Sequence, residues 1–198
     1  MDPGRVVILN GASSTGKTSI IECFRAWEAV AGDFWLVAAI DDVLARLPSE
    51  WNDVGWPGGP GRFADDGLRV VSGASGTMMS VGPLLRRLLR LYQQGVASAA
   101  RAGFDVIVDE VVLDPTARQD WIDALLGLPV SWVAVRCSAK TMEQRERQRG
   151  DRPIGLARAQ LATVHTDMRY DMEIDTTFQT AEGAAEVLVR FVSGSTSG

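Results

Sequence analysis

Residues 5–18 read Arg5-Val6-Val7-Ile8-Leu9-Asn10-Gly11-Ala12-Ser13-Ser14-Thr15-Gly16-Lys17-Thr18, and this stretch decides the fold. Its first part is a short continuous apolar run, which is typical of a buried parallel strand. The two glycines of the following loop permit backbone angles closed to other residues, so successive N–H groups can converge on an anion. Apolar residues at helical spacing come next, from Thr18 to about Val30. A strand, a glycine loop and a helix in this order predict a phosphate-binding loop.

The alternation of strand and helix continues along the chain. Apolar runs predict strands at 34–40, 104–109, 130–135 and 172–175, and helical patterns cover 42–47, 84–102, 115–126, 139–149, a stretch ending at about 164, and 181–192. Such alternation favours right-handed crossovers and a parallel sheet covered on both faces. The predicted fold class is therefore α/β, a P-loop kinase-like three-layer α/β/α domain with a five-stranded parallel sheet. This single domain spans residues 1–192, and residues 193–198 are expected to be a disordered tail.

The composition excludes several classes of protein. A net charge of −5 argues against nucleic acid as the main partner. No apolar run reaches transmembrane length and the first residues lack a secretory pattern, so we expect no membrane partner and a cytoplasmic location. Two cysteines cannot build a Cys-rich zinc site, and both are expected to be buried free thiols. His165 is the only histidine, and we expect it to be structural.

Three side chains of this pattern suit a nucleotide with its metal. Lys17 can reach the β- and γ-phosphates of ATP, and the Thr18 hydroxyl can bind Mg²⁺. Asp109 ends the third strand after an apolar run and resembles the Walker B carboxylate that lies near the Mg²⁺, although it could merely cap a loop. Glu110 follows and, by strand alternation, points elsewhere.

Asp41 follows the second apolar run. Open α/β sheets bind ligands beyond the carboxyl ends of their strands, so this side chain is expected to face the site. A carboxylate there could take the proton of an acceptor hydroxyl as it attacks phosphorus. Aspartate is equally favoured as a helix N-cap, although Asp42 could fill that position instead. The pattern alone leaves both roles open.

Arginines gather after the fourth strand, where Arg149-Gly150-Asp151-Arg152 leads out of a helix into a glycine and proline hinge. Such a hinge is how a mobile lid delivers guanidinium groups to phosphate, so residues 145–160 are expected to form a lid. Some of these arginines could instead pair with Glu143 and Glu146 on a solvated helix face. The predicted nucleotide-binding residues are Gly11, Ala12, Ser13, Ser14, Thr15, Gly16, Lys17, Thr18, Ser19, Arg145, Arg149 and Arg152.

The segment 49–83 has a different composition, rich in glycine, proline, tryptophan and methionine. A loop of this length in a compact domain is expected to be functional, here by covering an acceptor. Turn residues at 65–67 predict a small hairpin between Phe63 and residues 68–71. The segment holds only two arginines, Arg62 and Arg69, which favours an uncharged acceptor. Five large apolar residues could line its pocket or simply pack the lid: Trp51, Trp56, Phe63, Met78 and Met79.

The chain resembles the chloramphenicol phosphotransferase family along nearly its whole length. The likeness rests on residues 8–17, 40–42, 108–111 and 135–137. It is closest over 145–146 with 149–152, and over 164–165 with 170–171 and 175–177. It implies transfer of the ATP γ-phosphate to a hydroxyl of a small molecule, with Mg²⁺ as the metal. It further implies that Asp41 is the general base, and it places the arginines around residues 145–152 in the lid. The predicted catalytic residues are therefore Asp41, Lys17 and Arg149.

The resemblance supports the type of reaction more strongly than it supports the identity of the acceptor. Residues 71–79 are an added stretch relative to the family pattern, and they lie in the segment expected to cover the acceptor. The leading hypothesis is a resistance enzyme that phosphorylates chloramphenicol or another hydroxylated antibiotic. A metabolite kinase with a shikimate-like, nucleoside-like or sugar-nucleotide acceptor is the first alternative. A nucleotide switch without transfer is the second, and the guanine motif Asn-Lys-x-Asp that would support it is absent. The sequence leaves a homo-oligomer open.

Overall fold

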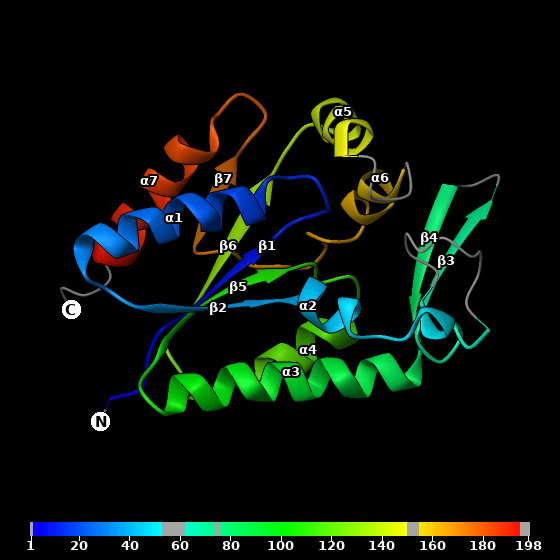
Figure 1. Cartoon of the computed structure of the whole chain (residues 1–198), viewed down its shortest axis with the longest axis horizontal. Helices are drawn as coiled ribbons and strands as arrows, with labels where there is room; N and C mark the ends of the chain where they lie inside the picture. The colour runs from blue at the N-terminus through cyan, green and yellow to red at the C-terminus, as the bar shows by residue number, and fades with distance from the viewer. Residues whose placement is uncertain (1, 53–61, 74–75, 150–154, 195–198) are drawn as a thin grey trace.

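The structure is a computed structural model that describes residues 2–52, 62–73, 76–149 and 155–194, with the backbone alone at 71–73 and 76–78. Its centre is the predicted five-stranded parallel sheet, which has the order β2-β5-β1-β6-β7 (Figure 1). The strands are β1 (Val6–Asn10), β2 (Trp35–Ala39), β5 (Asp105–Glu110), β6 (Val130–Arg136) and β7 (Met172–Asp175). The α/β fold class and the strand number are thereby confirmed.

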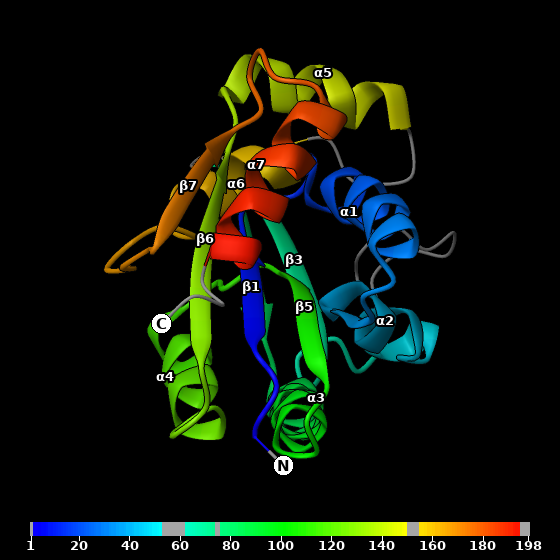
Figure 2. The same ribbon diagram turned by 90° about the vertical axis from the view of Figure 1, so that its left-hand side faces the viewer.

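Helices cover both faces of the sheet, as Figure 2 shows from its end. Helices α1 (Lys17–Ala31) and α7 (Ala181–Gly194) pack on one face, and α3 (Pro83–Arg101) and α4 (Pro115–Ala124) pack on the other. Alternation along β1 explains the two cores, because Val7 and Leu9 join the first cluster while Val6 and Ile8 join the second. A strand buried on both faces must be apolar throughout, which is why residues 6–9 form an unbroken apolar run.

The register of the sheet brings separate strand ends to one edge. Asn10 of β1 lies opposite Glu110 of β5, and Ala39 of β2 lies opposite Asp109. The phosphate loop follows β1, and the short helix α2 (Ile40–Ala45) follows β2. Residues far apart in sequence therefore meet beyond the carboxyl ends of the strands.

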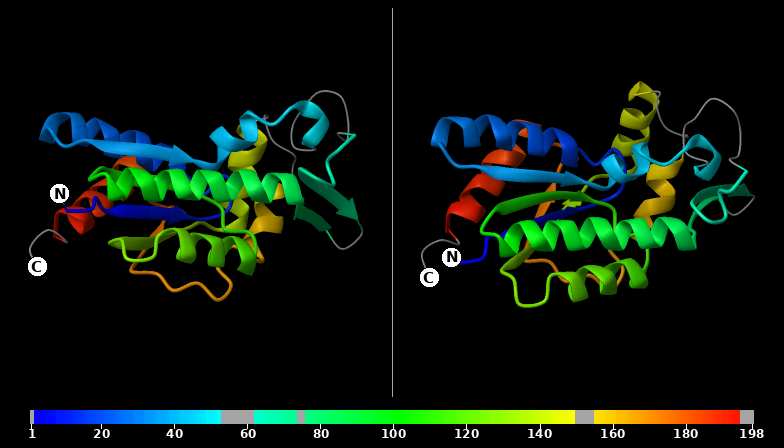
Figure 3. Two further views of the ribbon diagram at one scale, coloured as in Figure 1. Left: turned by 90° about the horizontal axis from the view of Figure 1, so that it is seen from below. Right: turned by 60° about the horizontal axis from the view of Figure 1, so that its bottom comes forward.

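The segment after α2 forms a separate antiparallel hairpin at the end of the molecule (Figures 1 and 3). A 3₁₀ turn at Ser49–Trp51 precedes the strands β3 (Leu68–Gly73) and β4 (Gly76–Val81). The prediction that Phe63 pairs with residues 68–71 is wrong. The Phe63 carbonyl accepts the N–H groups of Asp66 and Gly67, so this residue begins a tight turn, while its ring packs on Trp51 with centroids 5.0 Å apart.

The expected lid contains two helices, α5 (Ala139–Arg149) and α6 (Leu156–Leu161). Helix α6 ends earlier than predicted, because the backbone turns after Leu161 through hydrogen bonds such as Thr166 N to Thr163 O. At the other end of the chain, α7 continues through Gly194, two residues beyond Val192, and 195–198 lie outside the described residues. Cys137 is a buried free thiol as predicted, whereas Cys23 is only partly buried. Within the described residues, no helix combines the length and apolarity needed to cross a bilayer.

Candidate functional site

The phosphate loop between β1 and α1 has backbone geometry that few residues other than glycine allow. Gly16 has φ +98°, and a Cβ on Gly11 would lie 2.4 Å from the Val135 carbonyl oxygen. Ser14 also has positive φ, at 62°. The hydroxyl oxygens of Ser13 and Ser14 are buried and have no hydrogen-bond partner within the part of the chain that the structure describes. Buried polar atoms normally have partners, so this loop is suited to a polar ligand.

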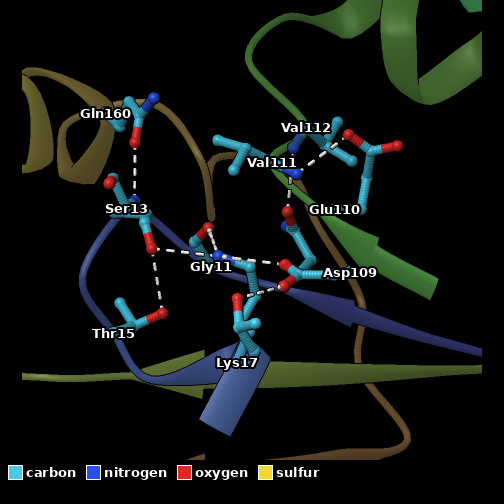
Figure 4. Close-up of polar contacts among 12 residues, drawn as sticks. Gly11, Ser13, Thr15, Lys17, Asp109, Glu110, Val111, Val112 and Gln160 are labelled. Atoms are coloured by element: carbon cyan, nitrogen blue, oxygen red, sulfur yellow. Dashed lines mark hydrogen bonds and ion pairs between the residues drawn. The ribbon is translucent and has the colours of Figure 1, made fainter. Parts of the chain in front are cut away.

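Lys17 lies folded against the loop, as Figure 4 shows. Its Nζ donates to the carbonyls of Gly11 and Ala12, at 2.8 and 3.1 Å, and lies 3.6 Å from Asp109 Oδ1. Burial lowers the pKa of the Lys17 ammonium, and the nearby carboxylates of Asp109 and Asp41 partly oppose this shift. A buried cation with carbonyl partners on one side is prepared for an anionic ligand on the other.

Asp109 and Thr18 meet beside this lysine. The Thr18 hydroxyl donates to Asp109 Oδ2 at 2.7 Å, which joins the start of α1 to the end of β5. A hydroxyl and a carboxylate are hard oxygen ligands of the kind that Mg²⁺ takes when it also binds phosphates. The described residues contain no group of three His, Cys, Asp or Glu side chains suited to a metal ion. Thr18 and Asp109 therefore fit a metal ion that would take its remaining ligands from nucleotide phosphates and water.

Glu110 points to the other face of the sheet, as strand alternation predicted (Figure 4). Its Oε1 accepts the Val111 N–H at 2.8 Å, and its Oε2 accepts the indole N–H of Trp121 at 3.0 Å. Burial raises the pKa of Glu110 to about 7, although both hydrogen bonds lower it. A carboxyl group with such a pKa changes charge near neutral pH.

The position of Asp41 differs from the predicted one. Strand β2 ends at Ala39, and Asp41 lies in the first turn of α2 instead of ending the strand. Ala39 is the N-cap of that helix, so the N-cap roles considered for Asp41 and Asp42 are wrong. The strand is short because its last aligned partner is Asp109, beyond which the neighbouring strand extends by only one residue. Asp41 nevertheless faces the same cleft as Lys17.

The arginines separate into different environments. Arg145 donates to the carbonyls of Thr15 and Thr176, at 3.2 and 2.9 Å, which ties α5 to the phosphate loop and to the end of β7. Arg149 lines the cleft, and Arg152 lies outside the described residues. Arg147 could have paired with the Glu143 carboxylate one helical turn away. Its Nε instead donates to the backbone carbonyl of Glu143.

The two glutamates of α5 bind residues of the lid and do not serve the predicted helix-surface pairs. The carboxylate of Glu143 pairs with Arg158 at 2.6 Å. Both carboxylate oxygens of the buried Glu146 accept backbone N–H groups, from Gly155 at 2.7 Å and Ala157 at 3.0 Å. A carboxylate at the N-terminus of α6 is favoured by the helix dipole, so tertiary contact outweighs the local pairing.

A cleft of about 380 Å³ connects these elements. Ten predicted site residues line it, namely Ser13, Ser14, Gly16, Lys17, Thr18, Ser19, Asp41, Asp109, Arg145 and Arg149. Gly11, Ala12 and Thr15 form the inner side of the loop, where their backbone atoms and the Thr15 hydroxyl bond within the protein. The cleft also contains Gln148 and Gln179, which no sequence signal had singled out.

A second, smaller cavity of about 30 Å³ adjoins this cleft, since Ile40 and Val111 line both. The hairpin contributes Met79 and Val81 to it, and β5 contributes Glu110. Of the expected apolar residues, Met79 lines the cavity, Trp51 and Phe63 pack on each other, and Trp56 and the Met78 side chain lie outside the description.

The sequence missed a charged pair in this second cavity. Arg86 of α3 lines it, and its Nη2 lies 3.0 Å from Oδ2 of Asp114, the N-cap of α4. Neither residue belongs to the segment 49–83, which the sequence predicts to cover the acceptor. Their helical charge pattern resembles a solvated surface, so only the packing of α3 beside α4 reveals them.

His165 has the structural role expected of it. Its Nδ1 lies 2.7 Å from the Tyr170 hydroxyl, which in turn accepts from Asn10 Nδ2 at 2.7 Å. Burial lowers the pKa of His165 to about 4, with Arg136 adding to the shift. The neutral ring accepts from the tyrosine, and the network fixes Asn10 at the start of the phosphate loop.

Solved structures with this fold include several kinases. A sugar kinase from Janibacter sp. has a TM-score of 0.67 at 19% identity, covering 96% of this chain and 95% of its own. The APS kinase of Mycobacterium tuberculosis, solved with AMPPNP and APS, has a TM-score of 0.62 at 15% identity, covering 98% and 99%. The shikimate kinase of Acinetobacter baumannii, solved with shikimate, has a TM-score of 0.60 at 10% identity, covering 100% and 97%. At these identities the likeness shows the fold.

Closer relatives define the family. A Mycobacterium tuberculosis protein named as an O-phosphotransferase is 30% identical over 177 residues, which are 89% of this chain and 77% of the relative. The family described as chloramphenicol phosphotransferase-like protein matches residues 4–193. The chain therefore belongs to the chloramphenicol phosphotransferase-like family and is an enzyme of the kinase type, an O-phosphotransferase.

Proposed function

We propose that the protein transfers the γ-phosphate of ATP, as its Mg²⁺ complex, to a hydroxyl group of an uncharged small molecule. The observation that carries this proposal is the convergence of the phosphate loop, the Thr18–Asp109 pair and Asp41 on one cleft. That cleft shares Ile40 and Val111 with the cavity under the hairpin. The two neighbouring spaces would serve as the donor and acceptor halves of the site.

The donor half binds the nucleotide. Backbone N–H groups of the loop and the N-terminus of α1 would hold the phosphates, with Lys17 on the β- and γ-phosphates. Thr18 and Asp109 would hold Mg²⁺, which when bound would supply positive charge beside the transferring phosphoryl group. Arg149, with Arg152 from the same lid, is proposed to contact the nucleotide, while Arg145 holds the loop in shape.

Asp41 is the proposed general base. Its carboxylate takes the proton of the acceptor hydroxyl as the oxygen forms a bond to the γ-phosphorus. The bond from that phosphorus to the bridging oxygen of ATP breaks at the same time, and ADP leaves. The position of Asp41 supports this role, because it lines the donor cleft beside Ile40, which borders both cavities.

The charges of the acceptor cavity support an uncharged acceptor. Its guanidinium, Arg86, is already paired with Asp114, and Glu110 adds a further carboxyl group. An anionic acceptor would lose its hydration without gaining an available cation from the described residues of this cavity. A hydroxylated antibiotic, modified for resistance in the cytoplasm where ATP is supplied, fits better than a carboxylate metabolite such as a shikimate-like acid. Family membership counts against the nucleotide switch.

An ATP-consumption screen against hydroxylated antibiotics and metabolites tests the proposal. We expect an uncharged hydroxyl compound to stimulate ADP formation and to gain the mass of one phosphoryl group. Asp41→Asn should lower kcat by about 10²-fold or more with little change in the KM for ATP, since general bases contribute on that scale. Asp42→Asn, one residue away in the same helix turn, is the matched control and should retain activity.

Two results would overturn the proposal. Full transfer by Asp41→Asn would remove the general-base role while leaving the kinase assignment intact. If carboxylate or sulfate acceptors alone were phosphorylated, the uncharged-acceptor assignment would be wrong and the metabolite kinase would replace it.

A further inference from the structure

Gln160 of α6 reaches the phosphate loop from the side opposite to Asp109 (Figure 4). Its Oε1 accepts the backbone N–H of Ser13 at 2.6 Å, in a contact where both residues are about 95% buried. Because an N–H group can only donate, this contact fixes which end of the amide is the oxygen. The Nε2 end then donates to the sulfur of Met79 in β4, at 3.3 Å. One side chain therefore bridges the nucleotide loop and the hairpin.

The Ser13 N–H is one of the backbone donors of the phosphate loop, the kind of group that binds phosphate oxygens in such loops. Ser13 lines the donor cleft, and its own hydroxyl oxygen has no partner among the described residues. Gln160 Oε1 thus occupies a loop N–H that a phosphate oxygen could otherwise accept. A nucleotide that fills the loop must compete with it for this donor.

The other end of the bridge lies at the acceptor cavity. Met79 lines that cavity, whose volume of about 30 Å³ is far below the roughly 300 Å³ or more of typical small-molecule sites. A molecule of antibiotic size can enter only if the hairpin moves. Helix α6 packs directly on β4, so a displaced Gln160 changes the support of that strand.

We propose that Gln160 is a positioning residue that couples the two halves of the site, resting on the nucleotide occupancy of the proposed function. While the loop is empty, Gln160 bonds Ser13 and holds Met79 over the acceptor cavity. A triphosphate displaces the Gln160 oxygen from Ser13, the contact with Met79 is released, and the hairpin opens. Nucleotide binding therefore precedes and favours acceptor binding, a coupling that both ligands must share.

The test uses Mg²⁺·AMPPNP as the probe, so that no acceptor is needed. Its dissociation constant is measured by calorimetry, and amide hydrogen exchange is followed in β4 and in the loop. In the wild type, the nucleotide should protect the loop and raise exchange in β4 severalfold. Gln160→Met keeps the size of the side chain but removes the competing oxygen, so AMPPNP should bind about 3-fold tighter or more. Its β4 amides should exchange rapidly already without nucleotide.

Two further variants separate coupling from a merely structural role. Gln160→Glu keeps an oxygen at Ser13 but places a negative charge near the phosphates, so AMPPNP should bind more weakly than to wild type. Met79→Leu removes the sulfur acceptor alone, so AMPPNP should bind at least as tightly as to wild type while β4 loses its response. A structural role would instead weaken binding in both Gln160 variants or in neither.

The outcomes are distinguishable from failure of the proposed function. If AMPPNP bound neither wild type nor any variant, the nucleotide proposal itself would fail, and the coupling with it. If AMPPNP bound wild type and Gln160→Met equally, or bound the variant more weakly, the coupling alone would be refuted. An unchanged β4 exchange in the wild type on nucleotide binding would refute it as well.

Discussion

The hydroxyl of Thr18 and the carboxylate of Asp109 lie 2.7 Å apart, although 91 residues separate them in the chain. The contact joins the first turn of α1 to the penultimate residue of β5. Both atoms are hard oxygen ligands beside the buried ammonium of Lys17. This junction is where the proposed Mg²⁺ would meet the phosphates.

Removal of the Asp109 charge should therefore mainly weaken the binding of Mg²⁺. We expect Asp109→Asn to raise the Mg²⁺ concentration for half-maximal activity by about 10-fold or more, since loss of even a group that only supports a metal ligand costs about that much. The measurement is a Mg²⁺ titration of ATP turnover. Asp105→Asn is the matched control, since Asp105 begins the same strand but pairs with Arg5 away from the cleft. An unchanged Mg²⁺ requirement in Asp109→Asn would contradict the metal assignment.

Lys17 is expected to be required for activity although it lowers the stability of the folded protein. Its buried ammonium is costly in the empty protein, as the lowered pKa of Lys17 indicates. Lys17→Met should abolish transfer and leave the free energy of unfolding unchanged or higher by about 1–2 kcal/mol, because apolar replacement of a buried charge is often stabilising. Urea unfolding and ATP turnover measure the two effects. Lys140→Met, at an exposed position of α5 and the only other lysine, should change neither. A large loss of stability in Lys17→Met would show that the lysine is needed for the fold.

Arg145 should not tolerate lysine. Its guanidinium reaches Thr15 and Thr176 from two different nitrogens, and a single ammonium cannot reproduce that geometry. Arg145→Lys should raise the KM for ATP by about 10-fold or more, since one charge-assisted hydrogen bond contributes on that scale. Arg147→Lys is the control, because Arg147 contacts the Glu143 carbonyl on the exposed side of the same helix. Equal KM values for the two variants would argue against the loop-holding role.

Glu110 should give the fold a characteristic pH dependence. Its pKa of about 7 in the folded protein lies above the ordinary 4.5, so the folded state holds its proton more tightly than the unfolded state. The associated stability is present below pH 4.5 and is lost as the pH rises through 7. The loss amounts to about 3 kcal/mol, from 1.36 kcal/mol for each pKa unit.

Urea unfolding at pH 5 and pH 8 measures this effect. Glu110→Gln should lose less stability between the two pH values than wild type does, because its side chain does not ionise. Glu186→Gln, on the exposed face of α7, should retain the wild-type pH dependence. The same pH dependence in wild type and Glu110→Gln would show that another group is responsible.

Much of the fold could be predicted because its central strands, β1 and β5, are short and buried on both faces. The run at residues 6–9 can only be a central strand, and the glycine loop after it fixes where the first helix begins. Predictions failed where tertiary contacts override local signals. Pairing along its own helix was the alternative considered for Glu146, but this side chain accepts backbone N–H groups at the start of α6. The hairpin was misplaced because its turn signal at 65–67 belongs to the tight turn before β3.

By itself, the sequence determined the proposed donor half of the site. Backbone angles closed to most residues and a strand buried on both sides leave a local signature, which residues 5–18 carry. Only the tertiary structure decided the acceptor half. Arg86, Asp114 and Glu110 line the second cavity from elements that meet through packing, and their local patterns resemble ordinary helix or strand surfaces. Gln160 likewise reaches Ser13 only through packing. Contacts between elements distant in sequence leave no periodic trace, so the second cavity and the Gln160 bridge became visible only in the folded chain.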